Sequence, residues 1–303
     1  MTKPVLTAAI AAAGALLLAQ DKASAPTVPV QTIVTVEAHK GKNVSGLNRE
    51  DVVALEGKQR LQVSSLTAGE AAGLELFLLI DDASGESLGS QLFELGRFIE
   101  NQPPATAIGI GYMRNGGANI AQNFTKDHLA VAKALRLPLS SPGVSPSPFE
   151  SLSDLIKRWP ATTARREVIL VTSGIDPLGG EADDPYLNTA IQQAQRNGVI
   201  VYALYTPAGG HLGHSYWRMN WGQNHLSQLA EETGGESYML GFGAPVSFAP
   251  YLNEIADHLA HQYIVGFQAI ARNKAGLQSV RFTTELPNTE LVSASKVWFP
   301  AGL

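Results

Sequence analysis

Runs of consecutive apolar residues alternate along the middle of the chain with segments in which apolar residues recur every three or four positions. Residues 76–80, 167–172 and 199–205 form such runs, which are typical of strands buried on both faces of a parallel sheet. Residues 88–99 and 149–159 are expected to be helices. This alternation predicts an α/β fold with a doubly wound, mostly parallel sheet covered by helices on both faces.

The patterns at both ends of the chain predict short strands instead of alternating strands and helices. Val30 to Ala38 alternates between apolar and polar residues, and Gly57 suits the turn between two strands that follow. We expect the two ends to join into one small β-rich element. Strands are predicted at 30–38, 52–55, 61–63, 262–269, 279–284 and 291–299.

Turn and capping residues set the remaining boundaries. Asn115-Gly116-Gly117 predicts a hairpin between two strands. Asp184 as N-cap, Pro185 in the first turn and Gly198 past the end bound a helix. The hairpin strands are expected at 107–113 and 118–124, further helices at 127–137, 224–233 and 251–261, and a short strand at 236–240.

The first 25 residues differ from the rest. Lys3 precedes an apolar stretch over 5–19, and Ala23-Ser24-Ala25 follows as a small-residue cleavage pattern. This layout predicts a signal peptide, with an uncleaved N-terminal anchor as the alternative. We therefore expect an exported protein, periplasmic or extracellular, divided into a signal peptide (1–25), a β-rich lead-in (26–72), an α/β domain (73–261) and a C-terminal β segment (262–303).

Composition and charge limit the kinds of ligand and chemistry that the chain can support. The chain of 303 residues carries a net charge of −5 with scattered basic residues, so it presents no pattern for binding nucleic acid. It contains no cysteine, which excludes disulfides, thiolate metal sites, cysteine nucleophiles and lipid attachment through cysteine. No segment after the first 25 residues is long and apolar enough for a membrane span, and the oligomeric state is open.

Ligands of doubly wound sheets bind beyond the carboxyl ends of the strands, so the segments 81–87, 140–148, 173–184 and 206–223 are the candidates for function. The first of them, Asp81-Asp82-Ala83-Ser84-Gly85-Glu86-Ser87, directly follows a buried strand. It resembles the start of the metal-ion-dependent adhesion site of the von Willebrand factor A (VWA) family, Asp-x-Ser-x-Ser. Carboxylate and hydroxyl oxygens of this kind suit Mg²⁺ or Mn²⁺.

The resemblance covers nearly the whole chain after residue 25. The strand that ends in Ser173-Gly174-Ile175-Asp176 looks like the family's fourth strand, and 149–155 looks like the helix before it. The segments 46–52 and 56–58, with the passage from 254–256 to 262–267, resemble the VWA-related type that is abundant in acidobacteria. The resemblance implies a VWA-type, Rossmann-like sheet and a protein-binding module.

The chain departs from the family pattern where the metal would bind. Counted from Asp82, Ser84 matches the first hydroxyl but Glu86 replaces the second; counted from Asp81, both hydroxyls are lost. Ser145 or Ser147 would stand for the family's threonine, and Ser173 replaces its aspartate, with Asp176 three residues later. Two interpretations stay open. The set Asp82, Ser84, Glu86, Ser147 and Asp176 holds Mg²⁺ or Mn²⁺ weakly, or the site is degenerate and Asp82 and Ser84 cap a helix.

The segment 206–223 holds Tyr216, Trp217, Arg218 and Trp221, residue types that anchor protein interfaces. We expect a partner-binding loop here, beside the adhesion-site position. The alternative is that these rings fold back onto the protein.

Enzyme chemistry has weaker support. His211 and His214, with His225, have a spacing that could chelate Zn²⁺, and Ser173 follows a strand without a nucleophile-elbow motif. The sequence therefore predicts a protein–protein interaction module that is not an enzyme. A structural envelope component with a vestigial site, or a hydrolase using His211, His214 or Ser173, are the alternatives.

Overall fold

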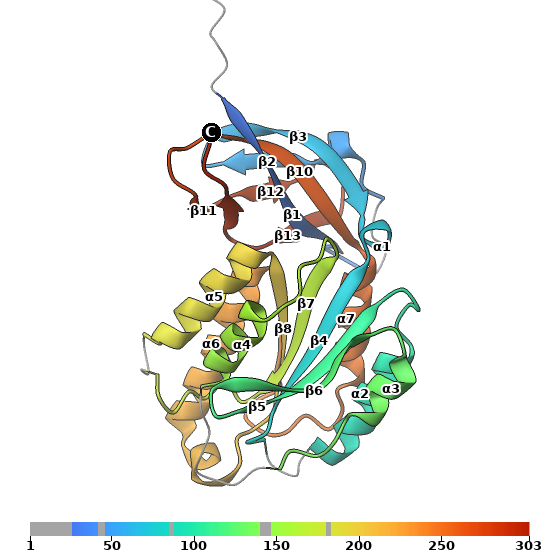
Figure 1. The fold of residues 1–303 in the computed structure, drawn as a ribbon, viewed down its shortest axis with the longest axis vertical. Coiled ribbons are helices and arrows are strands. Elements are labelled where there is room, and N and C mark those ends of the chain that lie inside the picture. The colour runs from blue at the N-terminus through green and yellow to red at the C-terminus, as the bar shows by residue number, and fades with distance from the viewer. Residues whose placement is uncertain (1–25, 42–45, 85–87, 140–146, 180–182, 303) are drawn as a thin grey trace, which may run out of the picture.

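The computed structural model describes residues 26–41, 46–84, 88–139, 147–179 and 183–302 as two stacked units (Figure 1). One unit is made of strands from both ends of the chain, and the other is an α/β unit. The chain leaves the β unit through β3 (Gln59–Ala68) and α1 (Gly69–Ala72), and it returns through α7 (Ala249–Ala260) into β10 (Gln262–Ile270). The α/β unit is thus an insertion between two paired strands of the β unit.

The α/β unit contains a six-stranded sheet in the order β6-β5-β4-β7-β8-β9. All neighbouring strands are parallel except β5 and β6, which form the hairpin predicted around Asn115 and Gly116, both with positive φ. The strands are β4 (Leu74–Asp81), β5 (Ala107–Arg114), β6 (Gly117–Thr125), β7 (Arg165–Thr172), β8 (Val199–Tyr205) and β9 (Ser237–Tyr238). The doubly wound, mostly parallel sheet expected from the sequence is confirmed.

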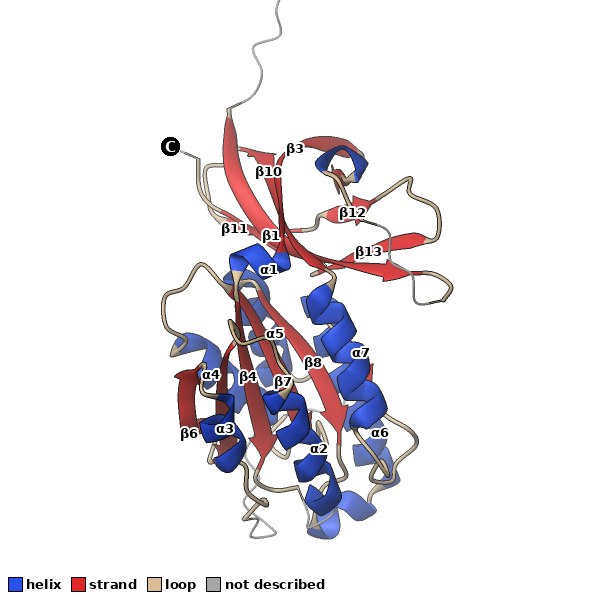
Figure 2. Ribbon diagram, turned by 90° about the vertical axis from the view of Figure 1, so that its right-hand side faces the viewer, coloured by secondary structure: helices blue, strands red, loops and turns tan. Residues whose placement is uncertain are grey.

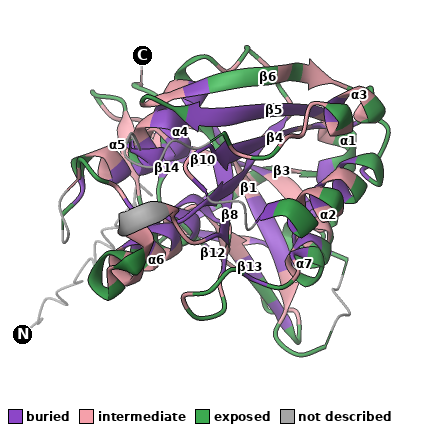
Figure 3. Ribbon diagram, turned by 90° about the horizontal axis from the view of Figure 1, so that it is seen from below, coloured by how far each residue is buried: buried purple, intermediate pink, exposed green. Residues whose placement is uncertain are grey.

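Helices cover both faces of this sheet (Figure 2). Side chains of β4 alternate between two cores: Leu76 and Leu78 pack toward α2 and α7, and Phe77 and Leu79 toward α4, α5 and α6. Figure 3 shows β4, β5 and β8 as buried, with the outer faces of the helices exposed. The helices are α2 (Gly89–Glu100), α3 (His128–Lys133), α4 (Pro148–Lys157), α5 (Pro185–Asn197) and α6 (Tyr216–Thr233).

The β unit confirms that the two ends of the chain join. Its six-stranded sheet has the order β12-β2-β3-β10-β1-β13, and β1 pairs antiparallel with β10 from Thr27↔Ile270 to Thr35↔Gln262. Beside it lie a two-stranded sheet of β11 and β14 and the short helix η1. These elements are β1 (Thr27–Ala38), η1 (Arg49–Asp51), β2 (Val53–Glu56), β11 (Gly276–Gln278), β12 (Arg281–Thr283), β13 (Thr289–Ser293) and β14 (Val297–Phe299).

Three predicted boundaries were wrong. The helix expected from residue 224 begins at Tyr216, because the Ser215 hydroxyl caps it by accepting a hydrogen bond from the Arg218 N–H (3.4 Å). The strand expected over 291–299 is two strands, β13 and β14. The helix expected over 127–137 ends at Lys133, since residues 134–139 turn away to contact Asp82.

Among the described residues, no helix is long and apolar enough to cross a membrane. The predicted signal peptide, residues 1–25, lies outside the described residues.

Candidate functional site

The carboxyl ends of β4, β7 and β8 meet at one edge of the sheet, the lower end in Figures 1 and 2. Asp81 ends β4, and its carboxylate accepts hydrogen bonds from the Thr172 hydroxyl (2.7 Å) and the Ala83 N–H (2.8 Å). Ser84 bridges to Ala208 beyond β8. The loops after β4 and β8 are therefore in contact at this edge.

Asp82 is engaged by an internal cation. Its two carboxylate oxygens accept hydrogen bonds from the two terminal nitrogens of Arg136 (2.7 and 3.1 Å), and one of them also accepts from the Leu139 N–H (2.8 Å). The Arg136 guanidinium lies 3.7 Å from the centre of the Tyr112 ring. The Asp82 side chain is 8% exposed and that of Arg136 36%, so the pair is half-sheltered from water. Such bidentate pairing is the strong form of an ion pair.

The two adjacent aspartates have opposite pKa shifts. Burial raises the pKa of Asp81, although the Thr172 and Ala83 hydrogen bonds oppose the shift. Burial also acts to raise the pKa of Asp82, but the hydrogen bonds from Arg136 and Leu139 outweigh it and the pKa is lowered. Asp82 is therefore held as a carboxylate by Arg136.

This arrangement does not fit a divalent ion at Asp82. An ion would have to displace Arg136 from both oxygens. Ser147 is engaged elsewhere, because its hydroxyl accepts from the Glu150 N–H (3.2 Å) as the N-cap of α4. The Ser84 hydroxyl is buried and has no hydrogen-bond partner among the described residues, and Glu86 lies outside them. Of the predicted ligands, Asp82 and Ser84 lie close together on one loop, and metal binding by the full set stays a prediction.

Asp176 belongs to a different group. It lies against Asp184, the N-cap of α5, and the Asp184 carboxylate is 4.0 Å from Nδ1 of His225 on α6. One carboxylate oxygen of each aspartate and Nδ1 of His225 are buried, and the two carboxyl groups lie close enough to share a hydrogen bond. The sequence correctly predicted the Asp184 cap, but nothing in it indicated that Asp184 and His225 lie together, because they come from different elements.

Burial is the main cause of the pKa shifts in this group. It raises the pKa of Asp184, and the neighbouring Asp176 raises it further. Burial also lowers the pKa of His225, against the opposing effect of Asp176. Both shifts favour the uncharged forms of Asp184 and His225.

The predicted partner-binding residues lie on the first two turns of α6 and not on a loop. Tyr216 and Trp217 are 59% and 70% exposed, and Tyr216 packs edge-on against Phe242. Trp221 and Arg218 line a cavity of about 100 Å³ together with Asp176 and His225. Two residue sets that the sequence treated separately thus surround one cavity.

More apolar side chains are exposed around the same edge than the sequence indicated. They lie after the ends of strands or beside the Asp82–Arg136 pair. Their positions in these loops are the sequence signal from which they could have been predicted. They are Leu137 (48% exposed), Leu139 (63%), Leu178 (62%) and Leu240 (77%).

The alternative catalytic residues are dispersed. The Ser173 hydroxyl is buried and accepts a hydrogen bond from the Ile175 N–H (3.3 Å). His214 is exposed at the end of the short helix η3 (Gly210–His214), and the side chain of His211 lies outside what the structure describes. No hydrogen bond or ion pair among the described residues joins Ser173 to a histidine.

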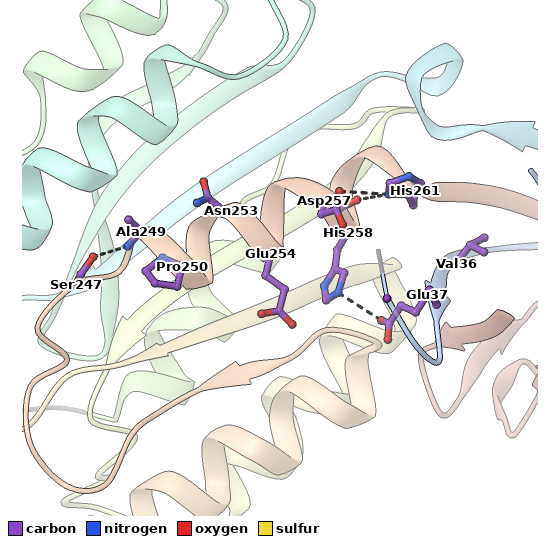
Figure 4. A pocket seen from close by; sticks show the side chains of 12 residues that line it. Val36, Glu37, Ser247, Ala249, Pro250, Asn253, Glu254, Asp257, His258 and His261 are labelled. Carbon is purple, nitrogen blue, oxygen red and sulfur yellow. Dashed lines mark hydrogen bonds and ion pairs between the residues drawn. The ribbon is translucent and has the colours of Figure 1, made fainter. Parts of the chain in front are cut away.

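A second cavity, of about 800 Å³, lies at the junction of the two units (Figure 4). Glu37 from β1 and Glu254 and His258 from α7 line it, and the His258 Nε2 is 3.7 Å from the Glu37 carboxylate. Burial, then repulsion by the nearby Glu236 and other glutamates, raises the pKa of Glu37 to about 7.

No protein-family model and no curated protein matches the sequence. Similar solved structures include BatB of Bacteroides thetaiotaomicron, at 12% identity over 62% of this chain and 97% of that chain, with a TM-score of 0.45. The manganese-loaded TRAP protein of Plasmodium vivax matches at 12% identity over 83% and 99% (TM-score 0.42). The ArnB paralog VWA2 of Sulfolobus acidocaldarius matches at 7% over 90% and 76% (TM-score 0.38). At TM-scores below 0.5, these likenesses carry no inference about metals or partners of this chain.

Proposed function

We propose that this chain is an exported protein-binding module of the VWA type whose binding edge works without a metal ion at Asp82. The observation that carries the proposal is that Arg136 occupies both oxygens of Asp82 at the centre of an edge rich in exposed apolar side chains. The order of strands in the sheet and the sequence resemblance support the VWA type.

The partner expected for such an edge is a protein surface with apolar groups. In a metal-dependent adhesion site the ion recruits an acidic group from the partner. Here Arg136 already neutralises Asp82, so attraction for a partner carboxylate is weakened and burial of apolar area supplies the affinity. Tyr216 and Trp217 are suited to be the anchors, since large aromatic side chains dominate interface energetics.

Photo-crosslinking tests the proposal. A photoreactive phenylalanine analogue placed at Leu178, on the proposed edge, is compared with one placed at Phe93 on α2, and both are irradiated in extracts of the native host with and without EDTA. We expect a discrete crosslinked species from Leu178 and not from Phe93, unchanged by EDTA. Trp217→Ala should reduce its yield by roughly tenfold or more.

The matched control is Phe93→Ala, since Phe93 and Trp217 are both 70% exposed. The proposal fails if EDTA abolishes the crosslink or if Phe93→Ala lowers it as much as Trp217→Ala does. Export is tested separately, by locating the chain in cell fractions and sequencing its mature N-terminus.

A further inference from the structure

Four side chains of the kinds that bind metals meet where the β unit lies against the amino ends of the parallel strands (Figure 2). Glu236 directly precedes β9, Glu254 and His258 lie on α7, and Glu37 lies on β1. One ligand atom each of Glu236, Glu254 and His258 lie within 4.8 Å of one another. Among the described residues, this is the group in which three possible metal ligands come so close together.

Two of the three ligands are neighbours on one helix. Glu254 and His258 are four positions apart on α7, so their side chains lie on the same side of the helix. Figure 4 shows both of them on the side of α7 where Glu37 lies. The ring of His258 also packs against the ring of Tyr202 from β8, with 6.0 Å between the ring centres. The imidazole is therefore held within the junction of the two units.

The third ligand comes from a different element. Glu236 stands directly before β9, and its carbonyl oxygen accepts a hydrogen bond from the Ala203 N–H of β8 (2.9 Å). Tyr238 on β9 stacks on Tyr251 of α7, with 5.3 Å between the ring centres. These contacts hold the start of β9 between β8 and α7, and they bring the Glu236 carboxylate to the two ligands on the helix.

The group has no internal cation of the kind that Asp82 has. Among the described residues, no lysine or arginine forms an ion pair with Glu37, Glu236 or Glu254. The His258 side chain is only 13% exposed, yet its ring forms no hydrogen bond within the described residues. Carboxylates gathered around a sheltered imidazole repel one another, and a bound cation removes this repulsion.

We propose that Glu236, Glu254 and His258 bind a divalent transition-metal ion of the Zn²⁺ class. Two carboxylates and one imidazole are ligands that Zn²⁺ accepts in four-coordinate sites, with a water in the fourth position. The adjoining cavity of about 800 Å³ gives the ion and this water access from solvent. The imidazole favours Zn²⁺ over Mg²⁺ or Ca²⁺, which prefer oxygen ligands.

A bound ion connects the two units of the molecule. It joins the start of β9 to α7, and the contact between the His258 Nε2 and the Glu37 carboxylate (3.7 Å) continues the connection to β1 of the β unit. The ion therefore stabilises the junction.

This site is separate from the proposed binding edge. Glu236 precedes β9, which is parallel to β8, so it lies at the amino end of the strands, whereas Asp82 follows the carboxyl end of β4. The proposal does not rest on the proposed function, since metal binding at the junction and crosslinking at the edge are measured separately.

Calorimetric titration of the metal-free full chain with Zn²⁺ tests the proposal, with the visible spectrum of bound Co²⁺ as a second readout. We expect one saturable site per chain and a Co²⁺ spectrum typical of four-coordination. His258→Gln and Glu254→Gln should each weaken binding by at least about tenfold. Because Zn²⁺ binds the folded protein, it should raise the Tm of the wild type and of neither variant. Glu254 is exposed, so Glu254→Gln is expected to fold, and Glu236→Gln replaces it if thermal unfolding without metal shows otherwise.

The matched controls are Asp257→Asn and His261→Gln, which should leave the affinity unchanged. These residues are also an acid and a histidine four positions apart on α7 beside the same cavity, with 3.8 Å between Nδ1 of His261 and the Asp257 carboxylate. Loss of binding in His261→Gln but not in His258→Gln would overturn the proposal in favour of this pair, and loss in His214→Gln alone in favour of the loop histidines. Absence of a saturable site would also overturn it, and would mean that water alone satisfies the group.

Discussion

Two groups of acidic residues lie at the same edge of the same sheet, and the surroundings of their carboxyl groups differ. Asp82, in the position where the sequence resembles a metal site, is paired within the protein by Arg136. Asp176 and Asp184 lie beside each other, and burial together with this proximity raises the pKa of Asp184. The comparison teaches that an acidic residue at a motif position can be neutralised from within the protein when a cation from elsewhere in the chain reaches it.

The two groups are joined through Thr172. Its hydroxyl donates to Asp81 (2.7 Å) and accepts from the Gly174 N–H (3.3 Å) at the start of the loop that carries Asp176. Substitutions can therefore target each group separately, or the connection between them through Thr172.

The largest effect is expected from Gly174→Ala, which disturbs the connection. Gly174 has a φ of +69°, and an added Cβ would lie 2.3 Å from the Gly222 carbonyl oxygen on α6. We expect a loss of about 3 kcal/mol in the free energy of unfolding, from backbone strain and overpacking together. Urea unfolding measures this loss. A change below about 1 kcal/mol would show that α6 is not seated on this loop as described.

Arg136→Ala should have the next largest effect, because it leaves Asp82 sheltered and unpaired. We expect a loss of about 2 kcal/mol, less than for a fully buried pair since Arg136 is partly exposed. Millimolar Mg²⁺ or Mn²⁺ should restore part of the stability of the variant and leave the wild-type protein unchanged. Thermal unfolding with and without the ions tests both statements, and an equal stabilisation of both proteins would contradict the pairing.

Substituting asparagine for Asp82 and for Asp184 should have opposite effects on the free energy of unfolding at neutral pH. The pKa of Asp82 is lowered in the fold, so its contribution to stability is present above its unfolded pKa and is lost as pH falls through the folded value. The pKa of Asp184 is raised, so its contribution is present at acidic pH and is lost as pH rises through the folded value.

At pH 7, Asp82→Asn should therefore cost about 1 kcal/mol, and Asp184→Asn should cost nothing or stabilise. Denaturant unfolding at pH 7 and pH 4 is the measurement. The comparison fails if Asp184→Asn lowers the free energy of unfolding more than Asp82→Asn does at pH 7.

A smaller effect is expected at the junction of the units. The pKa of Glu37 is raised from 4.5 to about 7, so the fold favours its protonated form and loses stability as pH rises from about 4.5 through 7. Glu37→Gln should be neutral near pH 4 and slightly stabilising at pH 8, where the wild-type glutamate faces Glu236 and Glu254 as an anion. Thermal unfolding across this range measures the difference. A variant that is less stable at pH 8 would instead assign the dominant role to the contact with His258.

Much of the fold could be predicted because local patterns decide it. The apolar runs of β4, β7 and β8, the Asn115-Gly116 turn, and the cap at Asp184 with Gly198 after α5 each act over a few residues. The start of α6 was missed because Tyr216 to Gln223 lacks a clear apolar period, and the cap at Ser215 was the only local signal.

The site was less predictable because its pairings join distant residues. Arg136 lies 54 positions after Asp82, beyond the end of α3, where nothing local indicates its partner. His225 and Asp184 come from neighbouring helices, and only the fold brings them together. The sequence could therefore name Asp82 and Asp176 as acidic residues at the right edge, but not that they belong to two different groups.

The most direct test of the account is the anomalous diffraction of crystals grown with Mn²⁺, recorded at the manganese absorption edge. We predict no manganese peak at Asp82, where Arg136 keeps both carboxylate oxygens. A manganese peak at Asp82 and Ser84, with Arg136 turned away, would contradict the account.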